Sequence, residues 1–191
     1  EPLTDYSRFK ADCESILDRY RSESFTTVTI RPATVCGYSP RQRLDVVVNI
    51  LTNLAYHKRE ITVFGGDQLR PNIHINDMVE AYLCLLRSPA DLISGKIYNA
   101  GYHNHPVRAL AEIVRSVIGD DVKLLTVPTD DNRSYHISST KIREELGFEA
   151  KHTINDAVCD LEKAFNQGLL PDSLSAEKYF NIKRMQSINL E

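Results

Sequence analysis

Short β-branched segments alternate with amphipathic segments along most of this 191-residue chain. Residues 25–31 are β-branched, alternate in character and end at Pro32, so they are expected to form a strand. Further strands are expected at 61–64, 73–75, 97–100 and 122–127. Helical spacing of apolar residues predicts helices at 4–20, 45–57, 106–118, 139–146 and 153–165, and another that Asn76 or Asp77 caps and Ser88-Pro89 ends. This alternation favours an α/β fold.

Composition and charge exclude several classes of protein. A content of 42% apolar and 26% charged residues is ordinary for a globular domain, and a net charge of −3 gives no electrostatic case for nucleic acid or an anionic membrane. The longest apolar runs are far too short to cross a bilayer. The four cysteines are scattered without metal-ligand spacing, so we expect no metal, reduced thiols and a cytoplasmic location. Cys84 and Cys159 lie on apolar helical faces and are expected to be buried.

Tyr6 and Lys10 lie four residues apart in the first expected helix. Side chains at i and i+4 lie one above the other on a helix, and an ammonium there favours the phenolate form of a tyrosine. A phenolate can take a proton from an alcohol or sugar hydroxyl near neutral pH. The spacing is a weak signal, because nine tyrosines and many lysines produce such pairs by chance; Tyr179 and Lys183 are another. A half-buried tyrosine beside a surface lysine is the structural alternative.

The chain opens Glu1-Pro2-Leu3-Thr4, with neither a methionine nor a preceding strand. A helix that carries catalytic groups would have to pack against an earlier element. We therefore expect the chain to be the later part of a longer protein. From Gly168 onward the helix and strand signals weaken, and residues 169–191 are interpreted as a tail.

Five segments occur in the order of a known family. They are Tyr6-xxx-Lys10, the run from Arg31 to Gly37, Val63 to Met78 with its Gly65-Gly66 turn, Ile97 to Gly101, and Asp131 to Tyr135 followed by Ser139, Lys141 and Glu145-Leu146-Gly147-Phe148. In this order they resemble the extended short-chain dehydrogenase/reductases, and within them the NAD-dependent epimerase/dehydratase enzymes of nucleotide sugars. The likeness covers residues 4–165.

The resemblance implies the last elements of a Rossmann-type parallel sheet and the smaller α/β substrate-binding domain. Residues 1–40 would be the C-terminal part of the NAD-binding domain, and residues 41–168 mainly the substrate-binding domain, with one strand or helix able to return to the Rossmann sheet. No glycine-rich G-x-G-x-x-G turn is present, and the Ser or Thr of the catalytic set would precede Glu1. The fragment could therefore be inactive alone.

The resemblance also implies residue roles. Tyr6 would be the general acid/base, Lys10 would support it and bind the nicotinamide ribose, and Pro32 and Ala33 would line the nicotinamide end of NAD. Arg70 and Arg133 would bind the diphosphate of a nucleotide sugar, since arginine offers fixed forked donors. Thr34 stands where many members carry a substrate-contacting asparagine.

Several arginines and histidines have weaker or alternative interpretations. Arg41 and Arg43 are lesser phosphate candidates, and each arginine has a solvated surface ion pair as its structural alternative. His74, in an apolar segment, is expected to be a packed core residue, and His103 and His105 do not have a diagnostic metal spacing.

Two functions compete. One is an NAD-dependent epimerase or dehydratase that oxidises a sugar hydroxyl to a keto intermediate, with a homodimer as the expected assembly. The other is a non-catalytic nucleotide-sugar-binding or dimerisation module. An unrelated α/β protein is the third possibility, and the sequence does not choose between epimerase and dehydratase or between NAD and NADP.

Overall fold

Three small sheets carry the fold in the computed structural model, which describes residues 5–129 and 134–188. Two are parallel strand pairs, β1 (Val28–Pro32) with β5 (Lys96–Ala100) and β3 (Glu60–Phe64) with β7 (Lys123–Val127). In the third, β4 (Leu69–His74) pairs in parallel with β2 (Thr34–Cys36) and antiparallel with β6 (Asn104–Pro106). The parallel pairing confirms the α/β fold class expected from the sequence.

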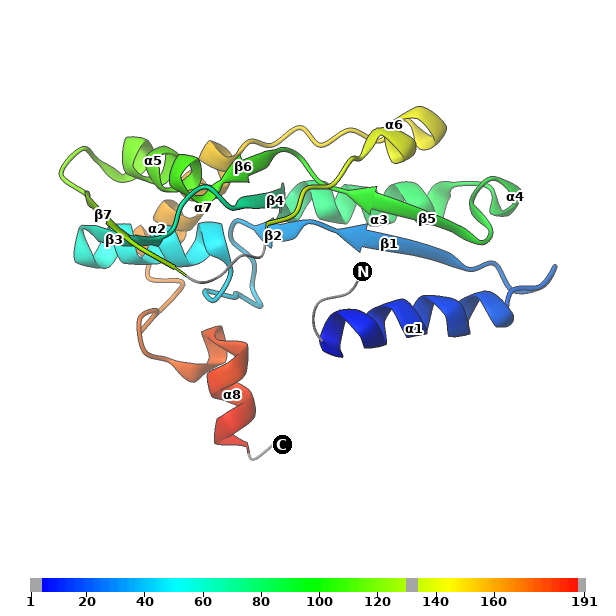
Figure 1. Cartoon of the computed structure of the whole chain (residues 1–191), viewed down its shortest axis with the longest axis horizontal. Helices are drawn as coiled ribbons and strands as arrows, with labels where there is room; N and C mark the ends of the chain where they lie inside the picture. The colour runs from blue at the N-terminus through cyan, green and yellow to red at the C-terminus, as the bar shows by residue number, and fades with distance from the viewer. Residues whose placement is uncertain (1–4, 130–133, 189–191) are drawn as a thin grey trace.

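Helices precede these strands, connect half of the consecutive pairs and follow the last strand (Figure 1). They are α1 (Asp5–Arg19), α2 (Val47–Lys58), α3 (Ile75–Arg87), α4 (Ala90–Ile93), α5 (Val107–Ile118), α6 (Thr140–Leu146), α7 (Ile154–Asn166), the 3-10 helix η1 (Glu177–Tyr179) and α8 (Asn181–Ser187). The expected helix bounds agree within a few residues. Thr153 and Asp156 form a capping box at the start of α7, and Gly147 is the left-handed C-cap of α6.

The buried apolar side chains form three clusters. The first joins α2, α5 and α7 to β3, and Leu110 and Val114 supply one helical turn of its interior. The second lies between the β1–β5 pair, β4, α3 and α6, around Ile73 and Tyr98. The third holds Leu44 and the end of α7 against the C-terminal segment. Burial of this apolar surface is the main force that holds the helices to the strands.

The sequence analysis differs from the structure at several local features. Residues 34–36, for which the sequence analysis predicted no strand, form β2 because their backbone pairs with residues 72–74 of β4. Cys159 is exposed on α7 and Cys84 is half-buried on α3, so the expectation that both are buried was wrong for Cys159 and only partly met for Cys84. Residues 177–187, interpreted as tail, contain two short helices, and Tyr179 of the first of them belongs to the third cluster.

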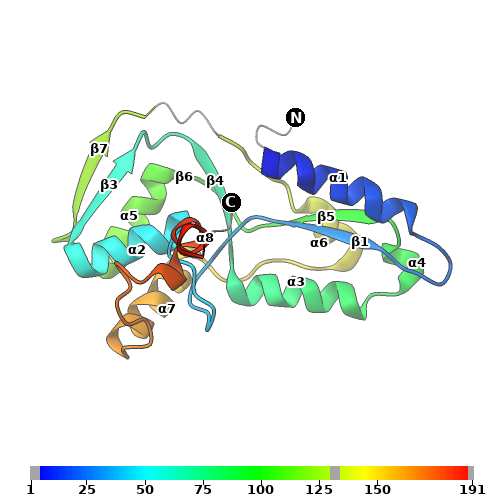
Figure 2. The ribbon, with the colours of Figure 1, turned by 90° about the horizontal axis from the view of Figure 1, so that it is seen from below.

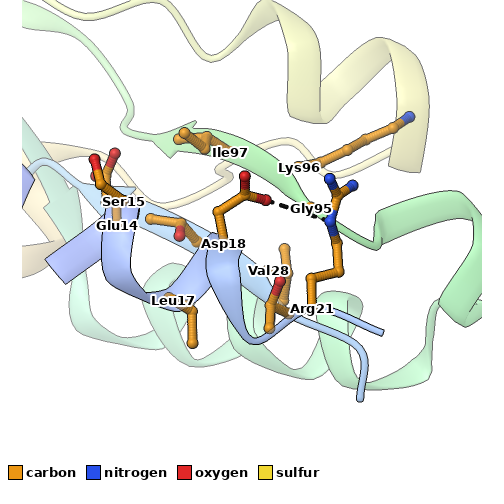
Figure 3. A pocket seen from close by; sticks show the side chains of 11 residues that line it. Glu14, Ser15, Leu17, Asp18, Arg21, Val28, Gly95, Lys96 and Ile97 are labelled. Carbon is orange, nitrogen blue, oxygen red and sulfur yellow. Dashed lines mark ion pairs between the residues drawn. The ribbon is translucent and has the colours of Figure 1, made fainter. Parts of the chain in front are cut away.

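Helix α1 lies alongside β1 in both views and runs in the opposite direction (Figures 1 and 2). It contains no buried residue, and Phe9 and Ile16 of its expected apolar stripe are 65% and 50% exposed. A cavity of about 360 Å³ separates part of α1 from the β1–β5 pair (Figure 3). Glu14 reaches the sheet by accepting a hydrogen bond of 2.7 Å from Nε of Arg31. The stripe is therefore present on α1 but does not enter the core.

The start of α3 is capped by His74, not by Asn76 or Asp77 as expected. Nδ1 of His74 accepts a hydrogen bond of 3.2 Å from the backbone N–H of Asn76. Asp77 is buried and instead accepts hydrogen bonds from the backbone N–H groups of Lys151 (3.0 Å) and His152 (2.8 Å) and from Nδ1 of His152 (2.7 Å). This carboxylate thus fixes the segment that leads into α7.

His74 is 1% exposed, which agrees with its expected place in the core. Its ring stacks on that of His152 at 4.6 Å, and Nε2 lies 3.3 Å from Asp160 without the alignment of a hydrogen bond. Burial lowers the pKa of His74 below its usual value and His152 adds to the effect, whereas Asp160 and Asp77 oppose it. Folding therefore favours the neutral ring.

A pH dependence of stability follows from this histidine. Because its pKa is lowered on folding, the stabilisation is fully present above the ordinary value of 6.5 and is lost as the pH falls towards the folded value. We expect the free energy of unfolding, measured by urea titration between pH 7.5 and 5, to fall less steeply in His74→Asn than in the unmodified chain. Equal slopes would contradict this assignment, whatever the difference in absolute stability.

Candidate functional site

Thr34 and Arg70, both expected to bind substrate, meet in one pocket of about 250 Å³. Its other lining residues come from the start of α2 and from the segment after β7, namely Asp45, Val46, Val47 and Tyr135. The pocket therefore joins residues that are up to a hundred positions apart in the sequence.

Strand pairing brings Thr34 and Arg70 together. β2 and β4 run in parallel with Thr34 opposite Asn72, and residues two apart on a strand point to the same face. Arg70, two residues before Asn72, thus lies on the face to which Thr34 points. The pairing of β2 with β4 is a contact between distant segments, which the sequence alone does not reveal. The sequence analysis therefore grouped Thr34 and Arg70 only through the resemblance to a known family.

The first turn of α2 contributes a feature that the sequence analysis missed. Val46 is its N-cap and makes no side-chain hydrogen bond to the helix. The first N–H groups of a helix lack partners within the helix, and the aligned peptide dipoles place partial positive charge there. An uncapped start of a 12-residue helix that lies in a pocket with an arginine favours an oxyanion. The signal in the sequence that could have revealed this uncapped helix start was an apolar residue at the N-cap position.

Asp45 is the acidic residue of this pocket, and its charge is engaged elsewhere. One carboxylate oxygen lies 2.9 Å from Nε of Arg43, and the other accepts a hydrogen bond of 2.8 Å from the backbone N–H of Asn181. Burial raises the pKa of Asp45, but these two hydrogen bonds, the positive charge of Arg43 and a hydrogen bond from its own backbone together outweigh it, and the pKa is lowered overall. The carboxylate is thus held by its neighbours and balanced by Arg43.

Arg70 is half-buried and held against the protein. One guanidinium nitrogen donates a hydrogen bond of 3.0 Å to the backbone oxygen of Leu69, and the guanidinium carbon lies 5.9 Å from the centre of the Tyr135 ring. That distance is within the range of a cation–π contact. Arg133, the second arginine expected at a diphosphate, lies outside the described residues.

Tyr6 and Lys10 share the exposed surface of α1. The Tyr6 side chain is 72% exposed, and Nζ of Lys10 lies 5.8 Å from the centre of its ring. The start of α1 lies towards the end of β1 in both views (Figures 1 and 2). Neither residue lines the pocket of Thr34 and Arg70. Their side chains are open to a ligand that binds on this side of the sheet.

Pro32 and Ala33 connect the two groups of residues. Pro32 ends β1, Ala33 is buried with its N–H donating 2.7 Å to the backbone oxygen of Ala100, and Thr34 begins β2. Ligands of open parallel sheets bind beyond the carboxyl ends of the strands. The end of β1 is such a place, and here it leads directly into the Thr34–Arg70 pocket.

Several other features of residues 5–129 and 134–188 bear on function. Within that part, no three histidine, cysteine or acidic side chains gather as a metal site, and His103 and His105 meet only edge to face at 5.8 Å. No helix there has the length and apolar character needed to span a membrane. Tyr179 is buried, and Lys183 packs over the Phe180 ring at 4.5 Å, so this second Tyr-xxx-Lys pair does not form a unit like Tyr6 and Lys10.

The N-terminal half of the chain matches a known protein family. The model of the NAD dependent epimerase/dehydratase family matches residues 1–101, which include Tyr6, Lys10, Thr34 and Arg70. The match thus covers just over half of the chain.

Individual relatives are more distant. UDP-arabinose 4-epimerase 1 of Arabidopsis thaliana is 25% identical over 175 residues, which are 80% of this chain and 42% of that protein. The structure of UDP-glucose 4-epimerase with UDP-glucose from Thermotoga maritima superposes with a TM-score of 0.76 at 24% identity, over 88% of this chain and 55% of that one. The NAD complex of dTDP-glucose 4,6-dehydratase from Bacillus anthracis gives 0.73 at 18% identity, over 96% and 56%. The chain spans about half the length of these proteins.

Proposed function

The chain belongs to the NAD dependent epimerase/dehydratase family, and from that premise we propose that it forms the substrate-binding part of a nucleotide-sugar epimerase or dehydratase. The observation that carries this proposal is the meeting of Thr34, Arg70 and the uncapped start of α2 in one pocket beyond the end of β1. Two relatives with this fold are a UDP-glucose epimerase solved with UDP-glucose and a dTDP-glucose dehydratase solved with NAD.

Arg70 and the first N–H groups of α2 would bind the diphosphate. A guanidinium supplies two parallel donors to phosphate oxygens, and the start of a helix adds backbone donors together with its dipole. Arg133, from the segment that precedes Tyr135, would supply a second guanidinium. Thr34 would contact the sugar, with a hydroxyl that can both donate and accept a hydrogen bond.

Tyr6 would accept the proton of the sugar hydroxyl as general base, and Lys10 would hold the phenolate form. NAD, when bound, supplies the hydride acceptor for the oxidation of that carbon to a ketone. The residues of this chain suited to its nicotinamide end are Tyr6 and Lys10, whose side chains are exposed, together with Pro32 and Ala33 at the end of β1. The donor set fits one end of the dinucleotide, since a phenol and an ammonium can both hydrogen-bond a ribose.

Arg70→Gln tests the diphosphate assignment on the chain as it stands. Charge-assisted hydrogen bonds to phosphate are the strongest contacts available in this pocket, so we expect UDP-glucose to bind about 10- to 100-fold more weakly. Isothermal titration calorimetry measures the change, and Arg87→Gln, at an exposed arginine of α3, is the matched control with unchanged affinity. Equal affinity for the Arg70→Gln variant and the unmodified chain would remove Arg70 from the site.

We also propose the domain organisation that the sequence predicts. Residues 1–40 would complete an NAD-binding domain, and β5 would be the strand of the later part that returns to its sheet, as its pairing with β1 supports.

The exposed apolar residues of α1 support a partner that covers this helix, and we propose that the partner is a second copy of the chain in a homodimer. Four free cysteines support a reducing, cytoplasmic setting.

A non-catalytic binding module remains the second candidate, favoured by the exposed surface of α1. The two candidates differ in one measurement on the chain itself. A module that only holds nucleotide sugars would bind UDP-glucose and show weak affinity for NAD in the same calorimetric titration.

A further inference from the structure

A second pocket, of about 280 Å³, lies between the loop before α2 and the C-terminal segment. Its lining contains three cationic side chains, Arg41, Lys178 and Arg184, and no acidic residue. Tyr38 and Tyr179 are its aromatic lining residues. None of these residues lines the pocket of Thr34 and Arg70.

The loop that carries Arg41 is braced from the inside. The side chain of Gln42 is buried, accepts 2.9 Å from the backbone N–H of Ser39 and donates 3.0 Å to the backbone oxygen of Arg43. Asn49, also buried, accepts 3.1 Å from the Gly37 N–H and donates 2.8 Å to the same Arg43 oxygen. The backbone on either side of Arg41 is thus held in place before any ligand arrives.

The other wall is fastened to this loop by backbone groups. The N–H of Leu44 donates 2.9 Å to the backbone oxygen of Tyr179, and the N–H of Asn181 donates 2.8 Å to the Asp45 carboxylate. These two contacts hold Lys178 and Arg184 opposite Arg41. The two walls are more than a hundred residues apart in the sequence, so it is the folding of the chain that brings their positive charges into one pocket.

The three cations lack acidic partners in the described part of the chain. Arg43, two residues from Arg41, forms an ion pair with Asp45, but Arg41, Lys178 and Arg184 form none within those residues. Nζ of Lys178 lies 4.8 Å from the centre of the Tyr179 ring. Like charges gathered in one small pocket repel each other, so an anion that enters it is favoured.

Tyr179 provides an independent observation that points to a ligand. Its side chain is 4% exposed, and its hydroxyl is buried without a hydrogen-bond partner among the described residues. Leaving such a group unsatisfied is unfavourable, and buried polar groups normally find partners. Because Tyr179 lines the pocket, an oxyanion seated there could supply the acceptor after a small adjustment of the wall.

We propose that this pocket binds a phosphate group. Arg41, Lys178 and Arg184 neutralise its charge, and the Tyr179 hydroxyl donates a hydrogen bond to one of its oxygens. The phosphate comes either from free inorganic phosphate or from a nucleotide, whose base would lie against Tyr38. The site is distinct from the Thr34–Arg70 pocket and does not depend on the function proposed for it.

Titration of the isotope-labelled chain with inorganic phosphate, followed by NMR, tests the proposal. The expected result is a saturable shift of the amide signals of Arg41, Tyr179 and Arg184. Arg41→Gln and Arg184→Gln should each weaken phosphate binding about tenfold, the size of one charge-assisted hydrogen bond. Tyr179→Phe should weaken it about three- to tenfold, as a neutral hydrogen bond does, without loss of stability.

Matched controls lie beside each cation. Arg43→Gln and Lys183→Gln remove charges that the structure engages elsewhere, and should leave phosphate affinity within about twofold. A parallel titration with uridine monophosphate distinguishes the sources, since tighter binding that is still sensitive to Arg41→Gln indicates a nucleotide. The proposal is overturned if Arg41→Gln and Arg184→Gln leave phosphate binding unchanged, or if Arg70→Gln abolishes it.

Discussion

With Tyr6 as the general base proposed above, Tyr6→Phe is expected to lower turnover about 10²- to 10⁴-fold, the range typical of a lost general acid/base. The phenylalanine keeps the ring of Tyr6 but cannot accept a proton. The affinity for the nucleotide sugar should stay within a few-fold, because Tyr6 does not line the pocket of Thr34 and Arg70. The measurement is of the proposed activity, with UDP-glucose as the trial substrate in the presence of NAD.

Tyr20→Phe is the matched control for this substitution. Tyr20 directly follows α1 and is 68% exposed, close to the 72% of Tyr6, so the same chemical change is made in a similar environment. Its turnover should equal that of the unmodified protein. A Tyr6→Phe variant with full activity would show that another group takes the proton, and the assignment of Lys10 would fail with it.

Asp77→Ala is expected to lower the free energy of unfolding by about 3 kcal/mol or more, because each buried donor left without an acceptor costs about 1–3 kcal/mol. Two such donors are the backbone N–H groups of Lys151 and His152, and the His152 ring loses its partner as well. Urea unfolding followed by circular dichroism gives the change. Helix α7 begins just after these residues, so its packing should be the first to weaken.

Glu80→Ala provides the comparison on the same helix. Glu80 is an exposed acidic residue of α3, and a surface substitution of this kind usually changes stability by less than about 0.5 kcal/mol. If Asp77→Ala were no more destabilising than Glu80→Ala, the three hydrogen bonds to Asp77 would not be holding the segment before α7.

Local patterns predicted the elements that depend mainly on local forces. The capping box of α7 satisfies N–H groups within one turn. The apolar spacing of residues 106–118 predicts α5, whose Leu110 lies in the core while Ile113 and Val117 pack against it half-buried. β2 was missed because its three residues pair only with a distant strand. The cap of α3 was misassigned because Asp77 has stronger partners near residue 152 than at its own helix start.

The features of the candidate site also differ in how far the sequence could predict them. Thr34 and Arg70 could be singled out from the order of motifs, but only the pairing of β2 with β4 puts them in one pocket. The start of α2 has no polar cap to reveal it in the sequence. Arg41, a lesser phosphate candidate of the sequence analysis, lies in a different pocket because the C-terminal segment folds against its loop.

A crystal structure with a bound uridine diphosphate sugar tests the central claim most directly. The account predicts phosphate oxygens within hydrogen-bond distance of the Arg70 guanidinium and the first N–H groups of α2, with the sugar towards Thr34. A diphosphate that avoids Arg70 and sits between Arg41 and Arg184 instead would contradict it.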